Sequence, residues 1–250
     1  MSFIFHNFFY APLYNGLILL INYIPFHSVG LAVVIFTCLV KIIIFPLSQQ
    51  SIKTQFEMKQ IEPELNEIKI KHADDKQVQA EKVMQLYKDK GINHFAGILL
   101  MLIQFPILIA LYWVFLKGGL PKIDAASIYS FTKIPEIINI NFLGISVSDK
   151  SIFFAFFVAL AQFLQMQITI PTPKKPAVKE GKDPGFSDEL AKSMNMQMKY
   201  VMPVVMFFIA KSFPLVVSLY LITSSLFAIG QELYMRMKYK TNTTGQVAKK

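Results

Sequence analysis

The sequence predicts an all-α, polytopic membrane protein with five transmembrane helices and a cytosolic helical hairpin. Hydrophobic residues make up 54% of the 250-residue chain and charged residues only 16%, which is unlike an ordinary soluble domain. Several nearly uninterrupted apolar segments are long enough to cross a bilayer, and the lysines gather between them. The predicted spans are residues 29–47, 96–116, 151–170, 200–212 and 215–234.

The fourth and fifth spans come from one apolar stretch, Tyr200–Tyr234, which Lys211-Ser212-Phe213-Pro214 interrupts. Because Pro214 cannot continue a helix, we expect a tight turn there. Residues 1–28 contain no Lys or Arg and no small-residue cleavage site, so we expect no cleaved signal peptide. The aromatic-rich segment Phe3–Pro25 favours a helix lying in the membrane interface, with a sixth span as the alternative.

The distribution of basic residues predicts the orientation. Residues 48–95, 171–199 and the tail 235–250 carry nineteen Lys or Arg. The remaining segments outside the spans carry five Lys or Arg; these segments are residues 1–28, residues 117–150 and the turn at Lys211. The positive-inside rule therefore places the N-terminus outside and the C-terminus in the cytosol. The net charge of +9 follows from this topology and favours anionic lipid or ribosomal RNA as partners, not DNA.

Residues 48–95 predict an αα-hairpin. Ser51–Ile70 and Asp75–Lys90 each place apolar residues at helical spacing among charges, and Gly91 follows as a helix cap. The hairpin is a candidate docking arm or mobile lid, and a solvated spacer is an equal alternative. Residues 171–199 are rich in Pro, Lys and Gly and predict a flexible linker. The polar tail from Thr241 is predicted to be disordered.

Polar side chains inside the predicted spans are the candidate functional residues. Lys41 is the charge within Val29–Leu47, and Thr37 lies one turn earlier on the same face. A charge within a span costs roughly 2.5–3.5 kcal/mol on insertion scales and usually faces protein or water, although Lys41 could instead snorkel. Each polar residue alone is at least as well explained by hydrogen bonding between helices. The further candidates are Gln104, Gln162, Gln165, Thr169, Ser218, Tyr220, Thr223 and Ser225.

Several functional classes have no support in the sequence. No Asp or Glu lies in the middle of a predicted span, since Glu232 falls at the inner end of the last one, which argues against a coupled transporter. A small-solute transporter or channel remains the alternative function. No nucleophile motif, metal cluster or phosphate loop is visible, so we expect no catalytic residue, no metal site and no cofactor. Cys38 is alone, which excludes an internal disulfide.

Four segments in order carry a resemblance to a known family. They are VVIFTCLVKIIIFPLS, IKHADDKQVQAEKVMQLYKDKGINHFAG, LLMLIQFPILIALYWV and PVVMFFIAKSFPLVVSLYLITSSL. Together they resemble the YidC/Oxa/Alb membrane protein insertases from about Tyr14 to Lys238. The resemblance implies a bacterial cytoplasmic membrane and a hydrophilic groove open to cytosol and lipid. It also implies nascent membrane protein clients, the ribosome, the lipid bilayer and the Sec translocon as partners.

The resemblance assigns groove positions to Lys41, Thr37 and Gln104, with Gln165 and Tyr220 in matching parts of the third and fifth spans. Members usually carry arginine where Lys41 stands, so the charge is kept and the planar fork is lost. Two further departures are Leu221 in place of an aromatic residue and Asn93-His94 in place of Asn-Pro. We therefore expect a short, core-only form, without the large extracytoplasmic domain of some members or the lipoprotein cysteine of others.

Overall fold

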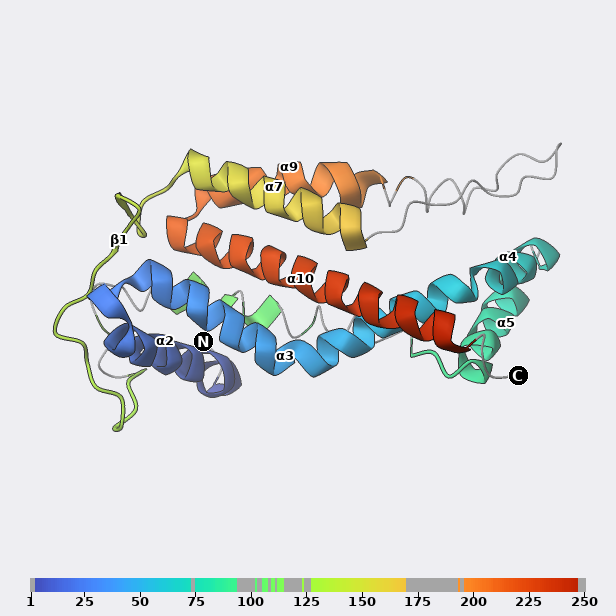
Figure 1. Ribbon diagram of the computed structural model, residues 1–250, viewed down its shortest axis with the longest axis horizontal. Coiled ribbons are helices and arrows are strands. Elements are labelled where there is room, and N and C mark those ends of the chain that lie inside the picture. Colours follow the sequence, from blue (N-terminus) through green and yellow to red (C-terminus); the bar gives the residue numbers. More distant parts are fainter. Residues whose placement is uncertain are drawn as a thin grey trace. The chain divides into compact units, whose positions relative to one another are not determined.

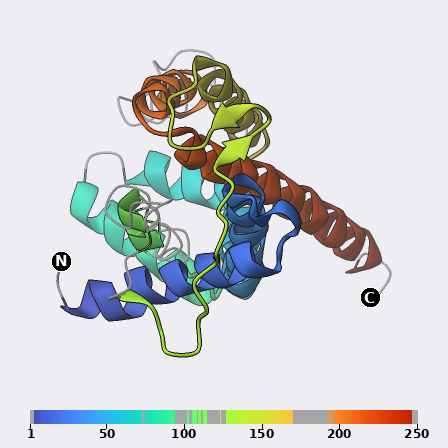
Figure 2. The ribbon, with the colours of Figure 1, turned by 90° about the vertical axis from the view of Figure 1, so that its left-hand side faces the viewer.

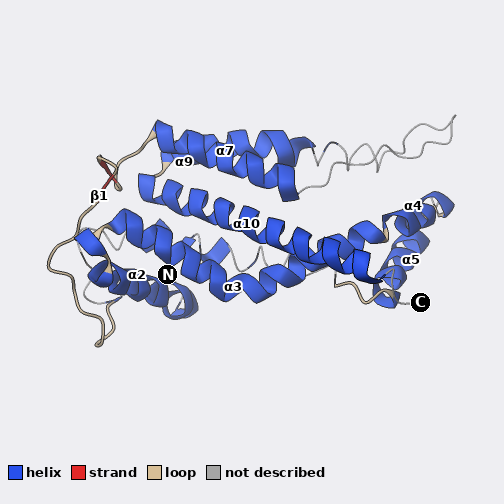
Figure 3. Ribbon diagram, viewed as in Figure 1, coloured by secondary structure: helices blue, strands red, loops and turns tan. Residues whose placement is uncertain are grey.

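The computed structural model describes residues 3–72, 75–93, 102, 105–107, 109–110, 112–114, 123, 127–169, 193 and 196–246. Within these ranges the chain is mostly helical, with one small two-stranded sheet (Figures 1 and 3). The elements are α1 (Phe3–Phe5), the π-helix η1 (His6–Tyr10), α2 (Ala11–Tyr23), the 3₁₀-helix η2 (Pro25–His27), α3 (Val29–Gln60), α4 (Glu62–Lys71), α5 (Lys76–Asp89), β1 (Asn141–Phe142), β2 (Ile145–Ser146), α7 (Ile152–Thr169), the π-helix η4 (Gln197–Val201), α9 (Met202–Ser212) and α10 (Leu215–Gln246).

Three of the described helices are long and apolar enough to cross a membrane. They are α3, α7 and the part of α10 over Leu215–Lys238, which coincide with the first, third and fifth predicted spans. The second predicted span lies largely outside the described residues, and its described part belongs to a shorter apolar helix, Phe105–Val114. The fourth corresponds to α9, which has 11 residues and follows η4 directly. The turn predicted at Pro214 is confirmed, because α9 ends at Ser212 and α10 begins at Leu215.

The chain divides into two compact units. Unit 1 comprises Met1–Ile42 and Leu108–Leu233, and unit 2 comprises Ile43–Ile107 and Tyr234–Lys250. The helices α3 and α10 each contribute to both units. In α3 the division falls one turn before Pro46, which cannot donate the usual backbone hydrogen bond to the carbonyl four residues back.

The core of unit 1 contains two well-packed helical faces. One is a face of α2 on which Tyr14, Leu17, Ile18 and Ile21 are fully buried, at the spacing of one helical stripe. The other lies between α7 and α9, which run side by side (Figure 1). Ala155, Val158 and Ala210 form a buried cluster there, and small side chains at this contact let the two backbones approach closely.

Residues 127–150, which we call the strap, cross one end of unit 1 (Figure 2). The strap pairs with the start of α3, where the backbone N–H of Val29 donates to the carbonyl of Asn139 at 2.9 Å. It also reaches α7, because the rings of Phe142 and Phe154 lie 6.4 Å apart. The strap therefore contacts the first turns of both α3 and α7.

The strap also holds the start of α10. The backbone N–H of Leu215 donates to the carbonyl of Asp149 at 2.7 Å, and that of Val216 donates to the carbonyl of Val147 at 3.1 Å. Pro214 ends the preceding helix, so these N–H groups at the start of α10 lack partners within the helix and need others. The strap supplies those partners and so sets where α10 begins.

The strap contains the small sheet. Strands β1 and β2 pair antiparallel, with Asn141 opposite Ser146. Leu143 and Gly144 join them with φ angles of 52° and 81°, as a type I′ hairpin turn requires. This tight turn lets the chain reverse before it enters α7.

Unit 2 contains a helical hairpin made by α4 and α5. The side chain of Asp75 caps α5 by accepting from the N–H groups of Gln77 and Val78, each at 3.0 Å. Gly91 ends it with a φ of 66°, and the N–H of Ile92 reaches back to the carbonyl of Tyr87 at 2.8 Å, which confirms the predicted glycine cap. Lys90 and Glu64 form an ion pair of 2.6 Å that joins the end of α5 to the start of α4.

The helix boundaries around the hairpin differ from the prediction. We expected the first span to end near Leu47 and the first hairpin helix to cover Ser51–Ile70, but α3 continues without interruption to Gln60. The break falls instead at Ile61, just before α4 with its Pro63. Proline is tolerated in the first turn of a helix, because N–H groups there have no partner within the helix and its missing N–H costs nothing. A proline cannot, however, extend the helix that precedes it. Pro46, in contrast, lies inside α3, where it removes one backbone hydrogen bond but does not end the helix.

The predicted disordered tail is wrong for residues 241–246, because α10 runs to Gln246. A helix that is already nucleated within a span adds one hydrogen bond for each further residue. The polar composition after Thr241 therefore did not mark the end of the helix. Residues 247–250 lie outside the described part of the chain.

The two glycines Gly91 and Gly230 predict opposite effects of the same substitution. A Cβ at either position meets no atom within 4 Å, so the effects come from the backbone alone. Gly91→Ala should destabilise the end of α5 by about 1 kcal/mol because of its positive φ, whereas Gly230→Ala should stabilise α10 by up to about 1 kcal/mol. Hydrogen exchange of residues 86–92 in the full chain should be faster in the first variant and unchanged in the second. Equal protection of these amides in both variants would contradict the assigned cap.

Candidate functional site

Six of the seven residues predicted to line a groove are described, and all six belong to unit 1. They lie in pairs on three helices: Thr37 and Lys41 on α3, Gln162 and Gln165 on α7, and Ser218 and Tyr220 on α10. Gln104 lies outside the described residues. That these residues line one groove stays a prediction.

The strap contacts the start of each of these helices, and the distance of each polar residue along its own helix follows from its position in the sequence. At about 1.5 Å per residue, Thr37 lies about 12 Å from Val29, and Lys41 about 18 Å from it. Gln162 lies about 15 Å along α7, and Ser225 about 15 Å along α10. Most of the predicted polar residues therefore lie well inside the helical segments, away from the strap.

The end of unit 1 next to the strap is apolar and closely packed. Val29 and Leu215 are fully buried, and Val33, Val216 and the strap's own Val147 are each 1% exposed. These side chains come from α3, α10 and the strap. We call these five residues the dry layer.

Beyond the dry layer, polar side chains are buried between helices. The hydroxyl of Ser225 donates to Oε1 of Gln162 at 3.3 Å, which joins α10 to α7. Ser218 is 1% exposed, and Tyr220 is 4% exposed. Hydrogen bonds of this kind between spanning helices are worth about 0.6 kcal/mol on average.

The hydroxyl of Thr37 is satisfied by its own helix. It is 1% exposed and donates to the carbonyl of Val33 at 2.7 Å. Back-bonding of this kind is common for threonine within helices and needs no ligand. Thr37 is thus at the border of the polar region, with only acceptor capacity left to offer.

A buried polar stripe on α10 extends further than the sequence analysis predicted. Ser218, Ser225 and Glu232 are spaced by seven residues, lie near one face of the helix and are each at most 6% exposed. Gln231, beside this stripe, has a buried Nε2 with no hydrogen-bond partner among the described residues. The seven-residue spacing was the signal that could have identified Glu232 as part of this stripe.

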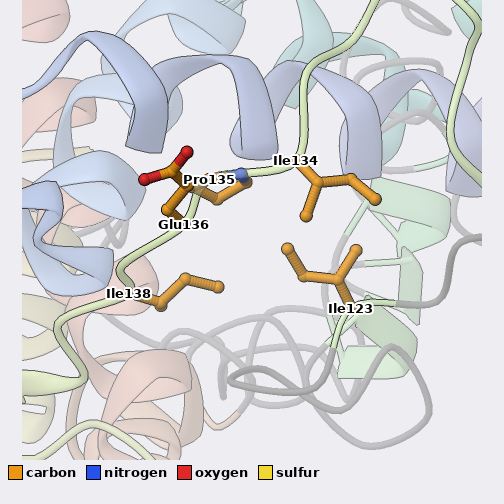
Figure 4. A pocket seen from close by; sticks show the side chains of 5 residues that line it. All are labelled: Ile123, Ile134, Pro135, Glu136 and Ile138. Atoms are coloured by element: carbon orange, nitrogen blue, oxygen red, sulfur yellow. The ribbon is translucent and has the colours of Figure 1, made fainter.

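A cavity of about 340 Å³ lies against the strap and not among the predicted groove residues (Figure 4). It is lined by Ile123, Ile134, Pro135, Glu136 and Ile138. Among the residues that the structure describes, no group of three His, Cys, Asp or Glu could hold a metal ion.

Long apolar helices with buried polar side chains, one pair of which is hydrogen-bonded between helices, are typical of a polytopic helical membrane protein. The chain belongs to the 60Kd inner membrane protein family, whose model matches residues 20–242. The family resemblance found in the sequence is thereby confirmed. The family and the apolar helices support a place in a bacterial inner membrane.

Curated relatives agree with this assignment. The chain is 30% identical over 211 residues to proteins named membrane protein insertase YidC from Francisella tularensis subsp. novicida (strain U112), subsp. tularensis (strain WY96-3418) and subsp. holarctica (strain FTNF002-00 / FTA). In each case the match covers 84% of this chain and 33% of the relative. The chain therefore spans about a third of the length of the curated relatives it matches.

The bond between Ser225 and Gln162 predicts a measurable coupling between α10 and α7. In a double-mutant cycle with Ser225→Ala and Gln162→Leu, we expect a coupling of about 0.6 kcal/mol, and no more than about 1.7 kcal/mol. The measurement is the unfolding free energy of the full chain in lipid or detergent. Pairing Ser225→Ala with Gln165→Leu provides the control, which should give strictly additive effects. Additivity in both cycles would show that the bond contributes nothing.

Proposed function

We propose that this chain is a membrane protein insertase and chaperone, which inserts nascent membrane proteins through a hydrophilic groove open to cytosol and lipid. The observation that carries this proposal is the set of polar side chains between the helices of unit 1, which includes the buried Thr37 and Ser218 and the hydrogen-bonded pair Ser225 and Gln162. The names of the curated relatives point in the same direction.

The proposed topology has five spans, with α9 and its preceding η4 as the fourth and the segment around Phe105–Val114 as the second. The counts of basic residues support an N-terminus and a strap outside the cell. The same counts support a cytosolic location for the α4–α5 hairpin and the C-terminus. The dry layer then closes the outer end of the groove.

The energetic role of such a groove follows from the cost of moving polar groups into hydrocarbon. A polar group without a hydrogen-bond partner costs several kcal/mol there. Groove side chains and water supply partners for the client's polar extracellular segment partway across the bilayer. The client's apolar segment then moves along α3, α7 and α10 into lipid. This last step needs no ATP, since burial of apolar surface is itself favourable.

Lys41 is the proposed recruiting charge. It lies about 18 Å along α3, beyond Thr37 and on the same face, where a client's acidic tail would meet it. The ribosome is the proposed partner of the hairpin and the basic end of the chain, and the Sec translocon is a further proposed partner. A transporter or channel is the second candidate function, but no observation on the molecule favours it.

Substitutions of Lys41 test the recruiting charge. Lys41→Arg should retain insertion, whereas Lys41→Ala should reduce insertion of clients with acidic N-tails roughly tenfold, and Lys41→Glu should reduce it further. Clients with neutral tails should lose far less, because no charge pair is removed. The measurement is insertion of matched single-span clients into proteoliposomes, with Lys211→Ala as a control for the loss of an exposed charge. An equal, negligible effect of Lys41→Ala on both clients would refute the recruiting role.

A pair of neighbouring cysteines tests access to the groove from the cytosol. Gln165 is half-buried, whereas Leu164 is 45% exposed on another face of α7 and should contact lipid. With native Cys38 replaced by serine, Gln165→Cys should react with a water-soluble maleimide added on the cytosolic side, and Leu164→Cys should not. Labelling of Gln165→Cys from both sides of the membrane would favour a channel.

A further inference from the structure

Asn15 on α2 binds the backbone of the strap through both ends of its amide. Its Nδ2 donates to the carbonyl of Ser127 at 2.9 Å and to the carbonyl of Ala11 at 2.8 Å. Its Oδ1 accepts from the N–H of Tyr129 at 2.8 Å. Only one orientation of the amide satisfies all three bonds, because a flipped amide would set its oxygen against two carbonyls. Asn15 is 3% exposed, so its loss would leave these strap groups without a partner in a buried place.

Asn22 repeats the contact two helical turns later. Its Nδ2 donates to the carbonyl of Lys133 at 2.6 Å and to that of Ile18 in its own helix at 3.3 Å. A separation of seven residues puts Asn15 and Asn22 near one face of α2. The two side chains therefore hold the strap at two points, both through backbone atoms.

The other contacts of the strap indicate which part of unit 1 it covers. After the two asparagine contacts it meets α3 at Asn139 and α10 at Val147 and Asp149. Val147 is itself part of the dry layer, and on α10 the buried polar residues begin at Ser218, two residues beyond Val216 of that layer. A shift of the strap would thus open the dry layer, the barrier between the polar region and the water at this end.

We propose that Asn15 and Asn22 are positioning residues that keep the strap over the outer end of the groove, and that this clamp prevents leakage of small ions while the groove is open to the cytosol. The outer location rests on the proposed function, whereas the seal itself does not. Neither asparagine contacts a client in this mechanism. Both act through the strap and the side chains of the dry layer.

The test measures ion leakage through the full chain in proteoliposomes without any client, using a trapped chloride-sensitive or proton-sensitive dye. Asn15→Leu should raise the leak rate roughly tenfold, the factor that corresponds to about 1.4 kcal/mol in a closed-to-open equilibrium. Asn22→Leu should raise it less, because its contact is exposed. Asn7→Leu, on the same N-terminal helical segment but with an exposed side chain, is the matched control and should not change the leak.

A second variant disturbs the strap without altering the asparagines. A Cβ at Gly30 would come within 2.8 Å of Cβ of Phe142, so Gly30→Ala must displace this strap residue. We expect it to raise the leak as well. As a further readout, Ser218→Cys in a Cys38→Ser background should become reactive to maleimide from the strap side in Asn15→Leu and stay protected in Asn7→Leu.

The outcomes separate this inference from the proposed function. Leakage in Asn15→Leu or Gly30→Ala supports the seal, whether or not the parent protein inserts clients. Leak rates equal to the parent in Asn15→Leu, Asn22→Leu and Gly30→Ala alike would overturn it, even if client insertion is lost. The strap would then serve packing alone.

Discussion

Hydrocarbon offers no hydrogen-bond partner, and this constraint orders the whole of unit 1. Backbone N–H and C=O groups satisfy their hydrogen bonds by forming helices. Small polar side chains do so by donating to the carbonyl four residues back, as Thr37 does at 2.7 Å and Ser212 at 2.9 Å. Among the described residues of unit 1, irregular backbone is found in the strap and in the turns at helix ends. There the N–H groups at the start of α10 take their partners from the strap, so one segment both caps and aligns the helices.

Some buried polar side chains do not take their hydrogen-bond partner from their own helix. Gln162 accepts from Ser225 across two helices, and the amide nitrogen of Gln231 has no partner among the described residues. A buried amide without a partner costs about 1–3 kcal/mol, so the surroundings of Gln231 are the least favourable of these.

The sequence predicted the features that local chemistry determines. The extent of α7, the turn at Pro214 and the cap at Gly91 each follow from a few adjacent residues, and the structure has all three. It did not predict that α3 passes through Pro46, because the stability of a long helix outweighs one missing hydrogen bond. The role of Asn15 was also hidden, since its strap partners lie more than 110 residues away in the chain and are backbone atoms, which leave no pattern.

The distance from the strap end to the first buried polar side chain differs between α3 and α10. On α3 the first buried polar side chain, Thr37, lies about 12 Å from Val29, whereas on α10 Ser218 lies only about 5 Å from Leu215. Both distances are short of the bilayer's hydrocarbon thickness of about 30 Å. Along α10 the stripe Ser218, Ser225 and Glu232 runs from hydroxyl to carboxylate with distance from the strap. A charge is least costly near the membrane surface, and the ionisable member of this stripe is the one that lies farthest from the strap.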